Sequence, residues 1–170
     1  LGVQLSTLVS LPFSQEFANA MGRDNRIRAG RLFGIVLVLA VVTSIAMGLG
    51  FTLFGQPFIA FWTRDAIHAS MPLIILMGIS SVASILWNPL ANFLLSINEQ
   101  RSYSYANVVA SVLGVIAIYL LAQGYGATAA GLSFAFVDLV TLIAVLLHIG
   151  RQWLPSTEFK AGIRCSCKEF

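Results

Sequence analysis

The chain has 170 residues, of which 58% are hydrophobic and only 10% are charged, and its formal net charge is +3. Its mean hydropathy is +0.85. Soluble domains carry about 25% charged residues, so this composition excludes an ordinary soluble domain and predicts a protein that lies in a lipid bilayer.

The amino-terminal residues predict the end of one membrane helix followed by a basic loop. Leu1–Phe13 is apolar and leads through Gln15 and Glu16 into a stretch rich in arginine. A secretory signal peptide would carry its cations before the apolar run and not after it. Because residue 1 is not a methionine, we expect the chain to be a fragment that begins inside a membrane helix. Segment 1–31 is therefore predicted to be the end of this helix and a basic loop.

Four apolar runs in region 32–149 are each long enough to cross a bilayer, whose hydrocarbon core of about 30 Å needs about 20 helical residues. Barrel strands would alternate in hydropathy over about 10 residues, whereas these runs are apolar without interruption over longer stretches. We predict an all-α fold, a polytopic membrane helix bundle with four full transmembrane helices and the end of a fifth. The four predicted spans are Leu32–Phe54, Met71–Ile97, Tyr103–Gln123 and Ala127–Ile149.

Polar or glycine-rich breaks at Gly55–Pro57, Asn98–Ser102 and Gly124–Gly126 separate these spans. The last two breaks are short enough to be tight hairpins, so consecutive helices are predicted to be antiparallel. With this alternation nine of the ten basic residues fall on one side of the membrane, and only Arg64 falls on the other. The positive-inside rule makes the basic side cytoplasmic. The basic loop and the tail 150–170 are therefore predicted to be cytoplasmic.

Four arginines are concentrated just before the first complete span, and two interpretations of them are open. They can orient the protein by contact with anionic lipid headgroups, each contributing on the order of 1 kcal/mol, or they can bind a phosphate of a substrate. No nucleic-acid-binding motif accompanies them, so nucleic acid is not an expected partner. These lipid-phosphate candidates are Arg23, Arg26, Arg28 and Arg31.

Small residues recur at helical spacing on two spans, which indicates faces where helices pack. Helices in lipid associate through small residues and polar contacts, because apolar side chains gain little by exchanging lipid for protein. The two faces are Ala40, Ser44, Gly48 and Thr52 on the first span, and Gly131, Ala135, Asp138 and Thr141 on the fourth.

The second span, which contains SSVASILWNPLANFLLS, combines a proline with polar residues at every fourth position. Pro89 has no N–H and leaves the carbonyl of Ile85 without its helical partner, so we expect a bend and take Pro89 as a hinge candidate. Lipid cannot satisfy the polar groups of such a stripe. They are predicted either to form interhelical hydrogen bonds or to line a wet cavity that contacts a substrate. The stripe is Ser80, Ser84, Asn88, Asn92 and Ser96, and Asn107 and Ser111 of the third span could extend it.

Asp138 is the twelfth residue of its 23-residue predicted span. An aspartate near the bilayer centre costs roughly 2.5 to 3.5 kcal/mol, so its side chain must face protein or water. No Lys or Arg lies at the same depth in the chain. Three roles remain open: a protonated group bonded to an amide, an ion pair with a cation from elsewhere in the protein, or a proton-coupling site. With Asp138 included, the substrate-cavity candidates are Ser84, Asn88, Asn92, Asn107 and Asp138.

No pattern in the sequence indicates an enzyme or a metal site. Cys165 and Cys167 lie one residue apart in the predicted cytoplasmic tail and are too few to complete a structural zinc site. The predicted topology places His68 and His148 too far apart to act together. No nucleophile elbow, phosphate-binding loop or dinucleotide fingerprint is present. We therefore predict no enzymatic activity, no cofactor and no metal.

Several segments occur in an order that resembles a known family of transporters. They are the amphipathic helix LPFSQEFANAMGRDNRIRAGRLF, the aromatic outer loop GQPFIAFWTRDA, the helix ILWNPLANFLLSINEQRSYSYANVV and the hairpin GYGATAAGLSFAF. In this order they are similar to the carboxyl-terminal part of bacterial oligosaccharide (O-antigen) flippases of the multidrug/oligosaccharidyl-lipid/polysaccharide exporter superfamily. The resemblance covers nearly all of residues 5–150.

The resemblance implies a fold of two six-helix lobes around a central cavity, with this chain forming part of one lobe. It implies that a polyprenyl-pyrophosphate-linked oligosaccharide crosses the bacterial inner membrane by alternating access, for the synthesis of lipopolysaccharide or another surface polysaccharide. The implied partners are this lipid-linked oligosaccharide, membrane lipids and the missing amino-terminal lobe of the same protein. The spans contain no Lys or Arg, so any cation that binds the pyrophosphate is expected from the missing lobe or from the loops.

Two alternatives remain open at this point. An ion-coupled multidrug exporter of the same superfamily would use a titrating acid such as Asp138. A non-transporting membrane scaffold of a glycan-synthesis complex would need neither a substrate cavity nor a coupling ion.

Overall fold

The computed structural model describes residues 13–23, 25–64 and 70–153, together with three isolated residues of the tail, Thr157, Ala161 and Ile163. A short helix over residues 13–22 precedes four long helices, and no described residue lies in a strand. The four long helices are α2 (Arg26–Thr63), α3 (Met71–Ser96), α4 (Arg101–Tyr125) and α5 (Ala127–Gln152). Each is long and apolar enough to cross a membrane, which confirms the predicted all-α membrane bundle. The predicted membrane helix at residues 1–12, His68 and the two cysteines lie outside the described residues.

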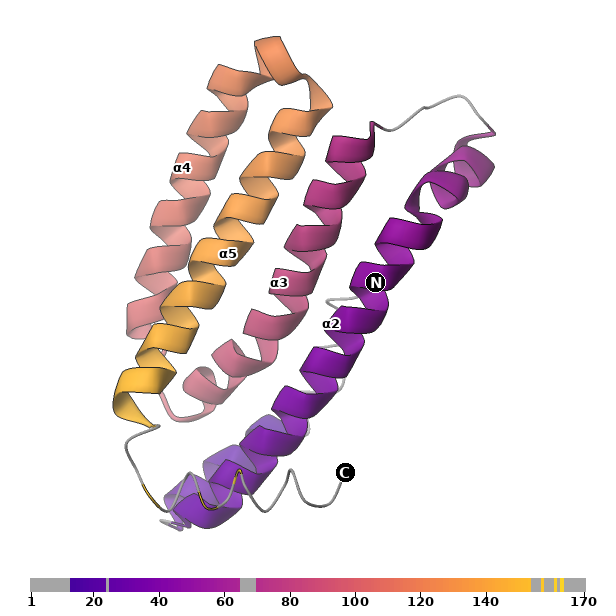
Figure 1. Ribbon diagram of the computed structural model, residues 1–170. Helices are drawn as coiled ribbons and strands as arrows, with labels where there is room; N and C mark the ends of the chain where they lie inside the picture. The colour runs from indigo at the N-terminus through magenta and orange to yellow at the C-terminus, as the bar shows by residue number, and fades with distance from the viewer. Residues whose placement is uncertain are drawn as a thin grey trace.

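The four long helices form a single layer in the order α2, α3, α5, α4 (Figure 1). Helices that follow one another in the sequence are antiparallel, but α4 lies at the edge of the layer. The chain returns through α4 to the upper end, so α5 packs between α4 and α3 and runs in the same direction as α3. The short helix over residues 13–22 lies at the lower end of the molecule, beside the start of α2 (Figure 1).

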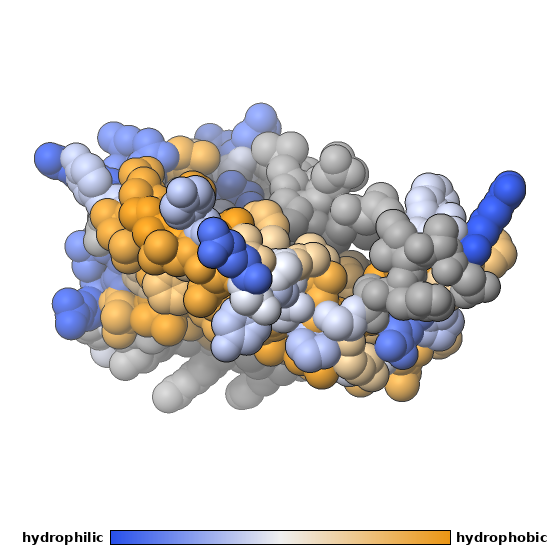
Figure 2. All heavy atoms as spheres, turned by 90° about the horizontal axis from the view of Figure 1, so that it is seen from above, coloured by the Kyte–Doolittle hydropathy of each residue, from blue (hydrophilic) through white to orange (hydrophobic). Residues whose placement is uncertain are grey.

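Large apolar side chains cover the open faces of this layer. On α4, Val108, Val115 and Tyr119 are 60%, 67% and 81% exposed, and α2 exposes Phe61 and Trp62 at 83% and 75%. Figure 2 looks down on the end at which α4 and α5 are joined and shows hydrophobic residues over much of the surface. Such a surface would drive aggregation in water. In a bilayer it can contact lipid chains or further helices.

Helix α2 is longer than the predicted span Leu32–Phe54 at both ends, because it begins at Arg26, inside the predicted basic loop, and because the predicted break at Gly55–Pro57 is wrong. Helix α2 starts after Asn25, whose side chain accepts a hydrogen bond from the Arg28 amide at 3.0 Å, and continues through Pro57 to Thr63. A proline removes one backbone hydrogen bond and does not have to end a membrane helix. Gly55 is not a loop residue either, since it is buried in the contact with α3.

The other two predicted breaks, Asn98–Ser102 and Gly124–Gly126, coincide with turns, but Arg101, Ser102, Gly124 and Tyr125 belong to α4. Helix α3 ends at Ser96 and α4 begins at Arg101. Helices α4 and α5 are joined by Gly126 alone, which has φ +52°. A side chain is disfavoured at this backbone angle, so glycine allows the chain to reverse within one residue.

Small residues mark the close approaches between the helices, as predicted. A Cβ atom on Gly48 or Gly55 of α2 would lie 3.0 or 2.8 Å from a methyl group of α3, and one on Gly131 of α5 would lie 3.3 Å from the Cβ of Leu76. The predicted face of α2 is correct at Ala40, Ser44 and Gly48, and that of α5 at Gly131, Ala135 and Thr141. Thr52 does not belong to it, because this residue is exposed and its hydroxyl donates to the carbonyl of Gly48 at 2.5 Å.

An aromatic cluster joins the helices at the lower end of the layer. The ring of Phe93, 1% exposed, makes edge-to-face contacts with Phe17, Phe33 and Trp153 at centroid distances of 5.1, 5.1 and 5.5 Å. These residues come from the short first helix, α2, α3 and the end of α5. Phe93 follows Pro89 by one turn, and α3 changes direction in its lower part (Figure 1). The bend expected at Pro89 would direct Phe93 into this cluster.

The close approach at Gly131 predicts that a larger side chain there will separate α5 from α3. We expect Gly131→Leu to destabilise the intact protein by about 1 to 3 kcal/mol, because overpacking forces the backbone to shift. The matched control is Gly50→Leu, since a Cβ atom at Gly50 meets nothing within 4 Å. Retention of monodisperse protein after heating in detergent measures the effect. Equal stability of the two variants would contradict the assigned contact.

Candidate functional site

Asp138 of α5 is bonded to two side chains of α3. Its carboxylate accepts a hydrogen bond from the hydroxyl of Ser80 at one oxygen and from the indole N–H of Trp87 at the other, the second at 3.0 Å. Ser80 and Trp87 are seven residues apart, so they lie on the same side of α3 two turns from each other. Asp138 is half-buried between them. The charged residue in the middle of α5 thus joins the two parallel helices of the layer.

These two partners decide what the carboxyl group can do. Neither is the amide that was one of the expected partners, and no cation among the described residues pairs with Asp138. The indole can only donate a hydrogen bond, whereas the Ser80 hydroxyl can either donate or accept one. The group can therefore keep both neighbours as a carboxylate or as a neutral acid. A proton could be taken up or released at this position without rearrangement of α3.

A second polar contact joins α5 to α4 close to Asp138. The amide nitrogen of Asn107 donates to the hydroxyl of Thr141 at 2.9 Å, and Thr141 in turn donates to the carbonyl of Val137 at 2.8 Å. The amide oxygen of Asn107 accepts from Ser111 at 3.5 Å. Thr141 has no exposed surface. Asn107, a substrate-cavity candidate, is thus already bonded to a neighbouring helix.

The five polar residues of the α3 stripe do not all face the same neighbour. A step of four residues advances about 40° around a helix of 3.6 residues per turn, so the stripe winds around α3. Ser80 reaches Asp138 on α5, whereas Ser96 donates to the carbonyl of Phe93 at 2.7 Å. Ser84, Asn88 and Asn92 between them are half-buried. Ser84 and Asn88 make no hydrogen bond within the described part of the chain.

The side of α3 that faces α2, roughly opposite Ser84 and Asn88, forms an apolar groove with α2. The groove has a volume of about 270 Å³ and receives Leu139 and Leu142 from α5. Its one hydroxyl, that of Thr52, is already bonded to the Gly48 carbonyl. The α3 residues that line it are Ile74, Ile75, Gly78, Ile79, Val82, Ala83 and Leu86. At about 100° per residue, the centre of this set lies roughly opposite Ser84 and Asn88 on the helix.

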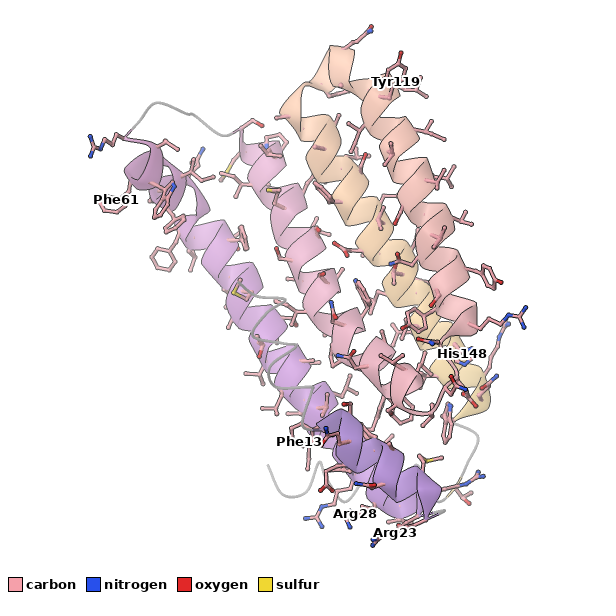
Figure 3. The ribbon with its side chains drawn as sticks, turned by 180° about the vertical axis from the view of Figure 1, so that it is seen from behind. Phe13, Arg23, Arg28, Phe61, Tyr119 and His148 are labelled. Carbon is pink, nitrogen blue, oxygen red and sulfur yellow. The ribbon has the colours of Figure 1, made fainter. Side chains whose placement is uncertain are left out.

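The arginine cluster lies at the lower end of the layer, where α2 begins. Figure 3 places Arg23 and Arg28 at the same end as His148, with Phe61 and Tyr119 at the other. Arg28 pairs with Glu16 at 2.7 Å, and both side chains are about half exposed. Cations near a helix amino terminus oppose the helix dipole by about 0.3 to 1 kcal/mol. Three of these arginines lie in the first two turns of α2 and Arg23 just before it, so their position is not explained by helix stability and agrees with a role at a charged membrane surface.

Two features of this site were not predicted from the sequence. Trp87 was not a candidate, although its spacing of seven residues from Ser80 places both on the side of α3 that faces α5. Thr141 was assigned to packing alone, but it also holds the amide of Asn107. No group of three or more His, Cys, Asp or Glu side chains comes together anywhere in the described ranges.

The partners of Asp138 predict different effects for two substitutions. Asp138→Asn keeps an acceptor for Trp87 and a polar partner for Ser80, so the abundance of the protein in the membrane should stay unchanged. Asp138→Leu leaves both donors without a partner and should cost about 1 to 2 kcal/mol, with a matching loss of abundance. Quantitative immunoblotting of membranes measures both. Equal abundance of the Leu and Asn variants would show that these hydrogen bonds do not stabilise the fold.

Comparison with known protein families indicates that the chain is part of a membrane transporter. The model of the MatE family matches residues 5–120, which is more than half of the chain and includes α2, α3 and most of α4. Neither the curated proteins nor the solved structures gave a match. MatE proteins are membrane transporters, exporters of the multidrug/oligosaccharidyl-lipid/polysaccharide superfamily, and are not enzymes. The chain belongs to the MatE family of membrane exporters.

Proposed function

We propose that the protein flips a polyprenyl-pyrophosphate-linked oligosaccharide across a bacterial inner membrane by alternating access, with its carboxyl terminus in the cytoplasm. The observation that carries this proposal is the two-sided character of α3. One side of this helix lines the apolar groove, and roughly opposite lie Ser84 and Asn88 without partners among the described residues. A lipid-linked sugar needs surfaces of both kinds, one for its hydrocarbon chain and one for its hydroxyl groups.

The candidate residues would have different roles toward the substrate, according to their chemistry. Sugar hydroxyls both donate and accept hydrogen bonds, as do the amides of Asn88 and Asn92. Asn107 and Asp138 are bonded to neighbouring helices, so they would support the cavity wall from behind. Pro89 lies next to Asn88 and could change the direction of the wall during transport.

The arginines at the lower end are suited to the pyrophosphate of the same substrate. Guanidinium groups bind phosphate oxygens through paired, charge-assisted hydrogen bonds. Arg23, Arg26 and Arg31 are exposed at this end, which the positive-inside rule assigns to the cytoplasm. They would receive the charged group before the sugar enters the membrane, together with residues of the other lobe.

Ion-coupled multidrug export is a second candidate, and Asp138 is the observation that favours it. Transporters that use a proton need an acid within the membrane that can change its charge. Asp138 can hold its two neighbours in both protonation states, as argued above. This candidate would place the coupling site at the contact between α3 and α5, away from the Asn88 side of α3.

The flippase proposal predicts that the amides of α3 matter for export and not for folding. We expect Asn88→Leu to leave abundance unchanged and to lower the surface glycan of intact cells roughly three- to tenfold, through the loss of one or two hydrogen bonds to sugar, and the addition of Asn92→Leu to lower it further. Asn107→Leu is the matched control, because it removes an amide that is bonded to Thr141 and should lower abundance and export together. Normal export by the double variant would contradict the role of this side of α3.

The two candidate functions differ in the effect of Asp138→Asn, which retains the hydrogen bonds of the site. A flippase that does not use a proton here should keep normal surface glycan with this variant. A proton-coupled drug exporter should lose efflux of a fluorescent cationic drug while its abundance is unchanged. Measurement of both outputs in the same cells therefore separates the two functions.

A further inference from the structure

A cluster of three side chains holds the connection between α3 and α4 against the end of α5. Glu99 lies in the four-residue connection over residues 97–100. One of its carboxylate oxygens accepts a hydrogen bond from the indole N–H of Trp153 at 3.0 Å. The same oxygen lies 3.5 Å from the Nε2 atom of His148 on α5. The carboxylate therefore faces two groups of α5 at once, but only one of them donates a hydrogen bond to it.

The Nε2 atom of His148 is buried and has no hydrogen-bond partner within the described residues. The side chain is 13% exposed, and that of Glu99 is 37% exposed. A buried polar atom without a partner is unfavourable. In the imidazolium form of histidine both ring nitrogens carry a proton and the ring is positively charged, so Nε2 is then a charged donor that faces a carboxylate oxygen, whereas the neutral ring carries one proton on either nitrogen. Protonation thus completes a contact for which the side chains are already in place.

We propose that Glu99, His148 and Trp153 form a proton-dependent latch between the α3–α4 connection and the end of α5. When His148 is protonated, the Glu99 carboxylate binds Trp153 and His148 together and holds the connection on α5. When His148 is neutral, the charge-assisted contact is lost and the bond from Trp153 is the one that holds the carboxylate. Trp153 also packs on Phe93, so the latch acts on the aromatic cluster that joins the lower ends of α2, α3 and α5.

Within the described ranges, the other charged and titratable groups around this cluster leave Glu99 as the partner of His148. Helix α3 carries no titratable side chain. On α4, the guanidinium carbon of Arg101 lies 6.0 Å from the centre of the exposed Tyr105 ring. Tyr103, between these two residues in the sequence, is half-buried. On α5 itself, Arg151 is exposed. In the short first helix, Glu16 is paired with Arg28.

The direction of the pH effect follows from the charge of histidine. The protonated form makes the extra contact, so the latch is complete at pH values below the titration of the imidazole and is lost as the pH rises through it. With the basic end in the cytoplasm, the latch would respond to cytoplasmic acidification.

Hydrogen exchange of the intact protein in lipid nanodiscs tests the latch. The amides of Asn98 and Glu99 donate to the carbonyls of Leu95 and Leu94 at 3.1 and 2.9 Å, so their exchange reports the opening of the connection. After correction for the intrinsic exchange rate, we expect opening to fall on the order of tenfold between about pH 8 and about pH 5.5, as expected for a hydrogen bond to a charged group. Equal opening of the wild-type protein at both pH values would overturn the proposal.

Four variants make the test specific. His148→Phe should open as at high pH throughout, and His148→Gln, which supplies a neutral donor, should stay protected at both pH values. Glu99→Gln keeps an acceptor for Trp153 and should lose the pH response. His68→Gln is the control and should retain it. If His148→Phe does not fold, His148→Gln and Glu99→Gln carry the test, and a full pH response in either of them refutes the latch.

Discussion

The contact between α3 and α5 is the interaction on which the rest of the layer depends. Helices in lipid gain little from burying apolar side chains against one another, so they are held by close backbone approach and polar bonds. This contact has both: Gly131 packs directly on Leu73 and Leu76, and Asp138 is bonded to Ser80 and Trp87. Because a carboxylate in the middle of a span must avoid lipid, α5 is forced into the interior of the layer. Helix α4 carries no such group and can occupy the edge.

The lower end of the molecule is organised differently, by aromatic rings instead of small residues. Phe93 contacts Phe17, Phe33 and Trp153 edge to face, and such contacts add to the stability that burial alone provides. The bend of α3 expected at Pro89 would bring Phe93 to the point where these helices meet. The upper ends of α2 and α3 have no comparable cluster within the described residues. The two helices are thus joined firmly at the basic end.

Helix α3 has the most demanding position in this arrangement, because three different environments surround it. Toward α5 it presents Ser80 and Trp87, toward α2 the groove residues Gly78 and Val82, and on its remaining side Asn88. A polar side and an apolar side on one membrane helix are expected where the helix separates lipid or protein from a wet path. Under the proposed function, α3 would be the helix that lines the route of a substrate with both kinds of surface.

The sequence by itself determined the class of the fold, because about 20 apolar residues in a row leave little choice but a membrane helix. It also predicted breaks at 98–102 and 124–126, where the structure has turns at 97–100 and at Gly126, and it predicted the small residues Gly48 and Gly131 at helix contacts. It could not predict that α2 continues through Pro57. A proline in the sequence indicates that one backbone hydrogen bond is lost, but it does not reveal that Gly55 packs on α3 at this point. Nor could spacing alone reveal that the stripe of α3 divides, with Ser80 bonded to Asp138 and Asn88 left apart. Those outcomes depend on which helices become neighbours. Only the tertiary structure decided that α5 lies between α3 and α4, because the half-buried carboxyl of Asp138 needs hydrogen-bond donors from α3, a helix distant in the sequence.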